Sequence, residues 1–320
     1  MKQKVVVFSQ INTEILNKLK LKYHVVEINP KAGDVNQQIL KEVEDADGMI
    51  GAGRLLNQHN LLSASRLKVI SSVSVGYDNY DIDYLNSQNI ILCHTPHVLT
   101  ETTADLAFTL LMSAARKVTY LDAWTKSGEW KKTVSSQQFG QDIYAKKLGI
   151  IGLGNIGAAI ARRGFYGFNM QILYHNRHEK PEIAMGFNAQ YCGLNELLQQ
   201  ADFIVVAVDL NAQSKALIGT AQFSHMQKHA VLINIARGSV VDEQALIHAL
   251  KTQQIYAAGL DVYHQEPLQV SELFQLDNVV TLPHVGSATT ETRFNMAELA
   301  YQNLVDVLEG RTPKYRVHSI

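Results

Sequence analysis

One continuous stretch, residues 146–177, constrains the fold more than any other, because it has the pattern of a strand, a glycine turn, a helix and a second strand. The apolar run from Leu148 to Ile151 predicts a strand that is buried on both faces, and a helix continues from Ala158 to Arg163. The glycines of the turn follow the pattern GxGxxG and lie where the chain reverses direction. This order is typical of the first unit of a dinucleotide-binding domain.

Each glycine of that turn has its own physical role. Gly152 allows the tight turn, Gly154 lets the backbone approach a pyrophosphate, and Gly157 lets the helix pack close to the strand. The phosphates would lie on free N–H groups at the positive end of the helix dipole, so Asn155 and Ile156 belong to the same predicted cofactor site. A GxGxxG match alone is a weak signal, but the strands and the helix around it favour dinucleotide binding over an ordinary turn.

The second strand, Met170 to Tyr174, ends where the adenosine ribose of a cofactor should lie. A site specific for NAD usually has Asp or Glu there, whereas this chain has His175, Asn176 and Arg177. Because no carboxylate repels a 2′-phosphate and a guanidinium can bind it with two hydrogen bonds, we expect NADP(H) to be preferred, with NAD(H) as the second option. The alternative is that Arg177 is a solvated residue of a polar loop.

The composition limits the classes of partner. With 29 basic and 30 acidic side chains in 320 residues, nothing suggests binding to nucleic acid or to an anionic membrane. The N-terminus becomes polar too soon for a signal peptide, and no apolar run approaches the length of a membrane span, so we expect a cytoplasmic protein. Cys93 and Cys192 lie in apolar surroundings, which argues against a disulfide framework, and no metal site is expected.

Short apolar strands alternate with helical patterns along the chain. This alternation predicts an α/β protein with two doubly wound parallel sheets and right-handed crossovers. A strong helix is predicted over residues 101–120, a polar irregular loop over 124–144, and a long final helix over 289–308. The predicted strands are 5–8, 23–28, 48–52, 67–75, 90–94, 148–151, 170–174, 203–208, 231–236, 257–262 and 279–282.

Polar residues of complementary chemistry follow several of these strands. Arg237 follows VLINIA, Glu266 lies shortly after AAGLDVY, and His284 follows NVVTLP, while Val75 and Gly76 end KVISSVSVG in the other predicted domain. In open parallel sheets, functional groups gather beyond the carboxyl ends of the strands. His284 alone could be a structural or surface histidine, but its position together with Arg237 and Glu266 favours an acid–base set.

These groups suit the reduction of a 2-keto acid, in which a hydride reaches the carbonyl carbon while an acid protonates the oxygen. A protonated histidine that is held by a carboxylate can supply that proton. Arg237 can bind the substrate carboxylate and polarise the carbonyl, and the N–H groups at Val75 and Gly76 can bind the carboxylate from the other domain. His284 is therefore the predicted acid and base.

Whole blocks of the sequence resemble a known family. INIARGSVVDEQAL, AAGLDVYHQEP and LPHVGSATTETR, together with SVSVGYDNYD, HTPHVLTETTADLAFTLLMSAARKV and SGEW, are similar to the signature blocks of the D-isomer-specific 2-hydroxyacid dehydrogenases. Within that family, the chain most resembles bacterial reductases of glyoxylate, hydroxypyruvate and 2-ketogluconate. The resemblance implies a flavodoxin-like substrate domain of residues 1–100 and 290–320, a Rossmann cofactor domain of residues 101–289, and a cleft between them.

The resemblance also assigns roles. It implies that Arg237 binds substrate, that Glu266 is the partner of His284, and that His284 donates the proton. It places Thr103 and Asp261 near the nicotinamide, although from the sequence alone Thr103 could as well start a helix and Asp261 form a turn. Ala236 and Gly286 are the remaining residues of the implied cofactor site.

Members of the family are usually homodimers that associate through the cofactor domains. Trp130 belongs either to that interface, to a neighbouring active site, or to ordinary packing. One segment departs from the family, because residues 209–214 read DLNAQS where relatives have a proline-containing turn with threonines. In the family this loop lies near the adenosine and the phosphates, so the departure bears on cofactor binding.

Three functions remain in competition. The first is an NADPH-dependent reductase of small 2-keto acids. The second differs in substrate only and is similar to phosphoglycerate or formate dehydrogenases, although a phosphate-bearing substrate would need more basic residues than YDNYD offers next to Val75. The third is a non-catalytic protein that senses dinucleotides and recruits partners, which the fold alone does not distinguish. The intact set of Arg237, Glu266 and His284 favours catalysis.

Overall fold

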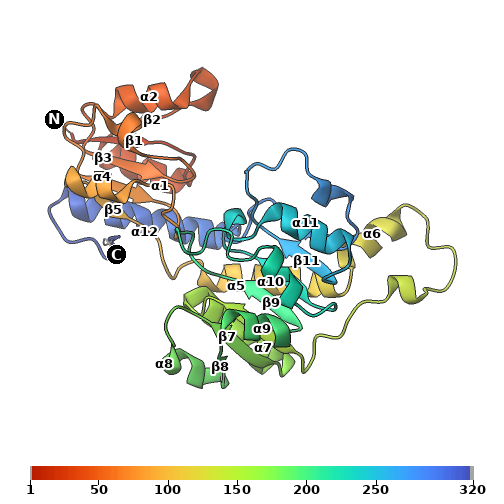
Figure 1. Cartoon of the computed structure of the whole chain (residues 1–320). Helices are drawn as coiled ribbons and strands as arrows, with labels where there is room; N and C mark the ends of the chain where they lie inside the picture. The colour runs from red at the N-terminus through yellow and green to blue at the C-terminus, as the bar shows by residue number, and fades with distance from the viewer. Residues whose placement is uncertain (1, 318–320) are drawn as a thin grey trace. The chain divides into compact units, whose positions relative to one another are not determined.

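The structure, a computed structural model, describes residues 2–317 and divides into two compact units (Figure 1). Unit 1 contains the described residues up to Leu99 and those from Ala288 onwards, and unit 2 is Thr100–Ser287. The predicted domain limits also include residues 1 and 318–320, which lie outside the described part. Each unit contains one parallel sheet with helices on both faces, so the prediction of two doubly wound α/β domains is confirmed.

The sheet of unit 1 has the strand order β2-β1-β3-β4-β5, and every neighbouring pair is parallel. This is the flavodoxin-like order that the family resemblance implied. The elements of unit 1 are β1 (Lys4–Val7), α1 (Thr13–Lys22), β2 (His24–Glu27), α2 (Val35–Glu42), β3 (Gly48–Gly51), α3 (Gln58–Leu61), β4 (Val69–Ser72), α4 (Ile82–Ser87), β5 (Ile91–Cys93) and α12 (Thr290–Leu308).

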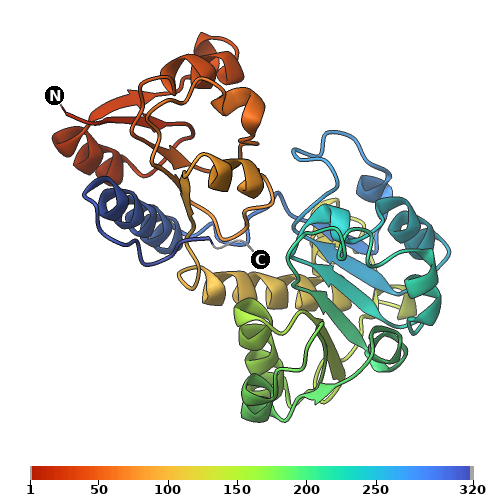
Figure 2. The ribbon, with the colours of Figure 1, turned by 60° about the vertical axis from the view of Figure 1, so that its left-hand side comes forward.

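Helix α12 lies along the strands of unit 1, although it comes from the other end of the sequence (Figure 2). Gly48 of β3 makes this close packing possible, because a Cβ there would lie 2.9 Å from Leu304 and 3.4 Å from Leu308. The hydroxyl of Ser71 on β4 donates a hydrogen bond to the carbonyl of Ala300 at 2.8 Å. The other face of the sheet is covered by α2, α3 and α4.

The sheet of unit 2 has the order β12-β11-β10-β9-β6-β7-β8, which is the Rossmann order with a further strand at one edge. Its central strands are buried on both faces, as predicted. The elements are α5 (Thr100–Ala115), α6 (Val118–Lys126), β6 (Lys147–Ile151), α7 (Asn155–Phe168), β7 (Gln171–His175), α8 (Pro181–Ala184), β8 (Gln190–Tyr191), α9 (Leu194–Gln200), β9 (Phe203–Val206), α10 (Thr220–His225), β10 (Val231–Asn234), α11 (Glu243–Lys251), β11 (Ala257–Leu260) and β12 (Val279–Thr281).

Helices α5 and α7 cover one face of this sheet, and α9, α10 and α11 cover the other. Helix α5 is apolar around most of its circumference, as a helix packed on a sheet and on a second helix must be. It meets β11 at Gly259, where a Cβ would lie 3.0 Å from the Cβ of Leu110. This contact packs the second half of α5 closely against β11.

The predicted single helix over 101–120 is wrong at its end. Helix α5 stops at Ala115 and α6 begins at Val118, because Lys117 adopts a left-handed φ of 53° that a continuous helix does not allow. The loop that was predicted to begin at residue 124 begins only after Lys126, where α6 ends. Spacing of apolar residues did not reveal the interruption, because it continues through the break.

Candidate active site

The glycine turn between β6 and α7 has the tight geometry that GxGxxG predicts. Gly152 adopts a φ of 103°, and a Cβ there would lie 2.6 Å from the carbonyl oxygen of Ala207. A Cβ on Gly157 would lie 2.1 Å from the carbonyl oxygen of Gly152. Neither position accepts a side chain without movement of the backbone. Helix α7 therefore starts in direct contact with the turn that follows β6.

The first turn of α7 fits the pyrophosphate of a dinucleotide. Gly154 is the N-cap of α7. In the described part of the chain, no side chain caps the helix there, and apart from neighbours along the chain no atom would lie within 4 Å of a Cβ on Gly154. The N–H groups of Asn155 and Ile156 are at the positive end of the helix dipole, where anions bind. Asn176 connects this turn to the end of β7, because its Oδ1 accepts a hydrogen bond from the N–H of Leu153 at 2.6 Å.

Arg177 lies exposed beyond β7 and contacts the loop that departs from the family pattern. Its Nη1 donates a hydrogen bond to Oε1 of Gln213 at 3.2 Å. The loop is internally ordered, since Oδ1 of Asn211 accepts hydrogen bonds from the N–H groups of Gln213 and Ser214, and the Ser214 hydroxyl donates to the carbonyl of Asp209. Gln213 carries no motif, and only the unusual sequence of its loop pointed to it.

His284 and Glu266 form a hydrogen-bonded pair beyond β12 and β11. Nδ1 of His284 lies 2.6 Å from Oε2 of Glu266. An ionised carboxylate only accepts hydrogen bonds, so Nδ1 is the donor and Nε2 remains for another partner. The backbone of His284 has a φ of 54°, which is uncommon for a residue with a Cβ, and such strain is concentrated at functional sites.

The pKa of the Glu266 carboxyl lies below its ordinary value. Partial burial would raise this pKa, but the hydrogen bonds from His284 and from the N–H of Tyr263, and the charges of His284 and Arg237, lower it more. Glu266 is therefore ionised near neutral pH and stabilises a positive charge on the imidazole. Arg237 acts on the same carboxylate, so the three predicted groups share one electrostatic environment.

The turn that carries Arg237 is organised by the buried side chain of Asn234, the last residue of β10. Asn234 Nδ2 donates to the carbonyl of Arg237 and its Oδ1 accepts from the N–H of Ala236, both at 3.1 Å. Nη1 of Arg237 donates to the carbonyl of Ala236 at 2.8 Å. Asn234 does not stand out in the sequence, because its strand reads as an ordinary apolar run.

Gly238 brings this turn against the segment that leads to Glu266. A Cβ on Gly238 would lie 1.8 Å from the carbonyl carbon of Tyr263 and 2.3 Å from the backbone nitrogen of His264. Backbone therefore contacts backbone here, with no space for a side chain. The relative positions of Arg237 and Glu266 depend on this contact.

Asp261 holds the backbone that follows His284. Its carboxylate accepts hydrogen bonds from the N–H groups of Val285 at 2.7 Å and Gly286 at 2.8 Å. Burial raises the pKa of Asp261, and these hydrogen bonds and the charge of His284 partly offset that effect. Thr103 on α5 lies next to the same backbone, because a Cβ on Gly286 would lie 3.5 Å from Cγ2 of Thr103. The beginning of α5 and the ends of β11 and β12 thus meet.

Val75 and Gly76 belong to unit 1, in the turn after β4. The hydroxyl of Ser74 donates to the carbonyl of Gly76 at 2.7 Å and is 2.6 Å from the hydroxyl of Ser72. The buried hydroxyl of Tyr80 donates in turn to Ser72 at 2.9 Å. A chain of three hydroxyl groups therefore fixes the conformation of this turn.

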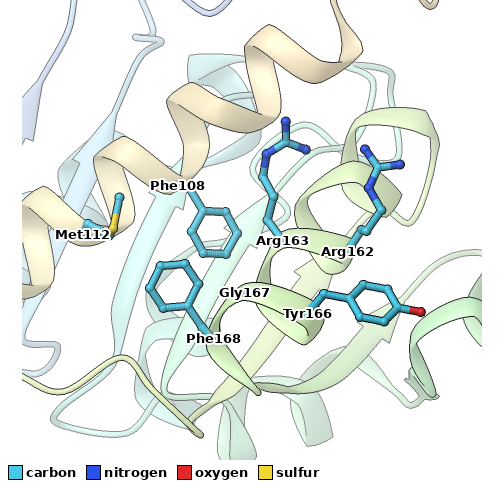
Figure 3. A pocket seen from close by; sticks show the side chains of 7 residues that line it. All are labelled: Phe108, Met112, Arg162, Arg163, Tyr166, Gly167 and Phe168. Atoms are coloured by element: carbon cyan, nitrogen blue, oxygen red, sulfur yellow. The ribbon is translucent and has the colours of Figure 1, made fainter.

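A separate hollow of about 560 Å³ lies between α5 and α7 (Figure 3). The rings of Phe108 and Phe168 stack within it at 5.2 Å between centroids. At its rim, Arg162 and Arg163 form ion pairs with Glu101 and Asp105. None of the predicted site residues lines this hollow. Its lining is Phe108, Met112, Arg162, Arg163, Tyr166, Gly167 and Phe168.

In residues 2–317, no group of three or more His, Cys, Asp or Glu side chains is arranged to hold a metal ion. Within the same residues, no helix combines the length and the apolar character needed to cross a bilayer. Both cysteines are buried, and burial raises the pKa of Cys93 to about 12 and that of Cys192 to about 11. Their thiols therefore stay protonated at neutral pH.

The chain is similar to known proteins over almost its whole length. The family model described as D-isomer specific 2-hydroxyacid dehydrogenase, NAD binding domain, matches residues 108–286. Glyoxylate/hydroxypyruvate reductase B of Erwinia tasmaniensis is 46% identical over 318 residues, which cover 98% of this chain and 98% of the relative. The protein of the same name from Citrobacter koseri is 44% identical over 315 residues, which cover 98% of this chain and 97% of the relative.

A solved structure extends this similarity to the fold. An NADPH-dependent glyoxylate/hydroxypyruvate reductase from Sinorhizobium meliloti, in complex with NADP and malonate, matches with a TM-score of 0.87. It is 31% identical, and the match covers 100% of both chains.

Proposed function

This chain belongs to the D-isomer-specific 2-hydroxyacid dehydrogenases and is an NAD(P)-dependent oxidoreductase, and we propose that it reduces small 2-keto acids to D-2-hydroxy acids with NADPH. The proposed substrates are glyoxylate, hydroxypyruvate and 2-ketogluconate. The observation that carries the proposal is the hydrogen bond of 2.6 Å between His284 and an ionised Glu266, next to Arg237. This set can stabilise and protonate a developing alkoxide.

Each residue of the proposed mechanism has a distinct task. The bound cofactor supplies the hydride for the carbonyl carbon. His284 donates the proton from Nε2 to the carbonyl oxygen, and Glu266 stabilises the imidazolium that this donation requires. Arg237 binds the carboxylate and polarises the carbonyl, with the N–H groups at Val75 and Gly76 as further donors. In the oxidative direction, neutral His284 accepts the proton from the hydroxyl group.

The cofactor site is proposed to comprise the glycine turn and the residues around it. Gly152, Gly154 and Gly157 form the turn, while Asn155 and Ile156 bind the pyrophosphate through their N–H groups. Asn176 and Arg177 bind the adenosine ribose and its 2′-phosphate. Thr103, Ala236, Asp261 and Gly286 are the residues proposed to lie near the nicotinamide.

A panel of substrates tests the function directly. Glyoxylate, hydroxypyruvate, pyruvate and 2-ketogluconate are each incubated with NADPH and with NADH while nicotinamide absorbance is followed. We expect turnover with glyoxylate and hydroxypyruvate, and a larger kcat/KM with NADPH. Binding of NADPH without turnover of any acid would instead support the non-catalytic dinucleotide sensor.

The preference for NADPH is proposed to depend on Arg177. Replacing Arg177 with Asp removes charge-assisted hydrogen bonds and introduces repulsion, so the ratio of kcat/KM for NADPH to that for NADH should fall about 10- to 100-fold. Gln213→Glu should act in the same direction, because a carboxylate at 3.2 Å would neutralise the guanidinium. Lys146→Asp makes the same change of charge at the amino end of β6 and should leave the ratio unchanged. An unchanged ratio in Arg177→Asp would refute the assignment.

We also propose a homodimer formed through unit 2. Residues 118–144 carry large apolar side chains that stay exposed in the single chain, among them Trp130, Val134 and Phe139 at 60%, 46% and 59% of their surface. The hollow between α5 and α7 is an apolar surface of the same unit that such side chains could cover. A second copy would bury both surfaces at once.

Trp130 provides the test of this dimer. The native protein should have twice the chain mass of 35.7 kDa in sedimentation experiments. Trp130→Asp should weaken the dimer by about 30-fold or more, because buried tryptophans dominate interfaces. Leu21→Asp changes a similarly exposed side chain in unit 1 and should not alter the mass. A monomeric wild-type protein at micromolar concentration would contradict the proposal.

A further inference from the structure

In unit 1, the side chain of His94 forms a hydrogen bond with the peptide group between Val75 and Gly76. Nδ1 of His94, the residue after β5, lies 3.0 Å from the carbonyl oxygen of Val75. A carbonyl oxygen only accepts hydrogen bonds, so Nδ1 must carry the proton and donate it. That carbonyl shares its planar peptide group with the N–H of Gly76, and in a trans peptide the two point in opposite directions. A donor that fixes the carbonyl therefore also fixes the direction of the N–H.

His94 is itself well anchored. Its N–H donates to the carbonyl of Tyr315 at 3.2 Å, and its carbonyl accepts from the fully buried side chain of Asn303 on α12 at 3.1 Å. Its ring meets the ring of Tyr77 edge to face, with 5.7 Å between centroids. The imidazole thus has one orientation imposed by its backbone and its packing, and it needs no reorganisation to hold the turn.

Two side chains form hydrogen bonds with carbonyl groups of this turn. The hydroxyl of Ser74 holds the carbonyl of Gly76, and His94 holds the carbonyl of Val75. Only the second acts on the peptide group that contains the Gly76 N–H. Donation to a carbonyl also polarises the whole peptide group, which makes its N–H a stronger donor.

We propose that His94 is a positioning residue for the carboxylate of the substrate. It orients and polarises the Val75–Gly76 peptide, so that the Gly76 N–H is preformed to bind a carboxylate oxygen. The inference rests on the proposed function, in which this N–H is a carboxylate donor. Since every 2-keto acid has the same carboxylate, His94 should contribute equally to the binding of each of them.

The test uses two variants of equal shape. His94→Asn retains an N–H donor near the position of Nδ1, whereas His94→Leu has the same branching without a donor. We expect His94→Leu to raise the KM for glyoxylate and for hydroxypyruvate by the same factor, about tenfold, as for the loss of one hydrogen bond to a charged group. The kcat and the KM for NADPH should stay within about twofold, and His94→Asn should remain close to wild type.

Controls separate this role from a structural one. His97→Asn changes a nearby histidine whose ring contacts Tyr315, and it should not change the KM for either acid. If His94→Leu does not give a cooperative melting transition, His94→Phe replaces it, because that ring keeps the contact with Tyr77. Unchanged KM values in the donor-free variant, equal losses in His94→Asn and His94→Leu, or a fall in kcat alone would each overturn the inference. Wild-type protein that turns over no 2-keto acid would instead overturn the proposed function.

Discussion

Replacement of His284 by glutamine should lower kcat for glyoxylate reduction by about 10²- to 10⁴-fold, the range typical of a lost general acid. Glutamine cannot donate a proton from an ionised state, so the alkoxide that forms as hydride arrives is left without its acid. The KM for NADPH should change little, because the glycine turn and Arg177 are untouched. The readout is nicotinamide absorbance at saturating NADPH and glyoxylate.

The chain provides a matched control for His284→Gln. His229 also pairs with a carboxylate, since its Nε2 lies 2.7 Å from Oδ1 of Asp202. That pair lies at the amino end of β9, whereas catalytic groups in such sheets gather at the carboxyl ends. His229→Gln should therefore keep full activity. Wild-type kcat in His284→Gln would remove this residue from the mechanism, whatever the control showed.

Replacement of Gly238 by alanine should lower kcat/KM by about 100-fold or more, because catalytic groups misplaced by 1 Å commonly lose that much. The new Cβ would lie 1.8 Å from the carbonyl carbon of Tyr263, so the two backbone segments must separate. That separation moves Arg237 relative to Glu266. The cost of overpacking should also lower Tm by about 3–10 °C.

Gly186→Ala is the control for Gly238→Ala. Gly186 is exposed, and no atom would lie within 4 Å of a Cβ placed there. This variant should keep its kcat/KM and its Tm within error. Activity measured well below the Tm of each variant separates misplacement from unfolding. Normal kcat/KM in folded Gly238→Ala would show that the contact between the two turns does not set the geometry of the site.

The fold could be predicted because its signals are local. Apolar runs of four to six residues, separated by helical spacing, specify strands buried on both faces, and such strands form parallel sheets. The break at Lys117 was not predicted, because one residue with a left-handed backbone does not change the spacing of the apolar residues around it. The strand orders of the two sheets were implied by the family resemblance, and no single residue specifies them.

The polar residues directly after strands could be proposed as site residues for a related reason, since an arginine or a histidine interrupts an apolar context. Their partners were harder to find. Gln213 and His94 contact residues 36 and 19 positions away, and a sequence does not show such contacts. Asn234 contacts its own turn, but it ends an apolar strand and belongs to no motif. The sequence does not indicate the role of Gly238 either, because that role depends on contact with Tyr263, which is 25 residues away.

During synthesis, the strands of unit 1 leave the ribosome well before α12, which packs on β3, β4 and β5, has been made. Until residues 290–308 emerge, the face of β3 and β4 that later receives Leu304 and Ala300 has no cover. Thr100–Ser287 is continuous in sequence and can complete its own core first. Unit 1 can therefore complete its core only after the end of the chain has been made, whereas unit 2 can complete its core earlier.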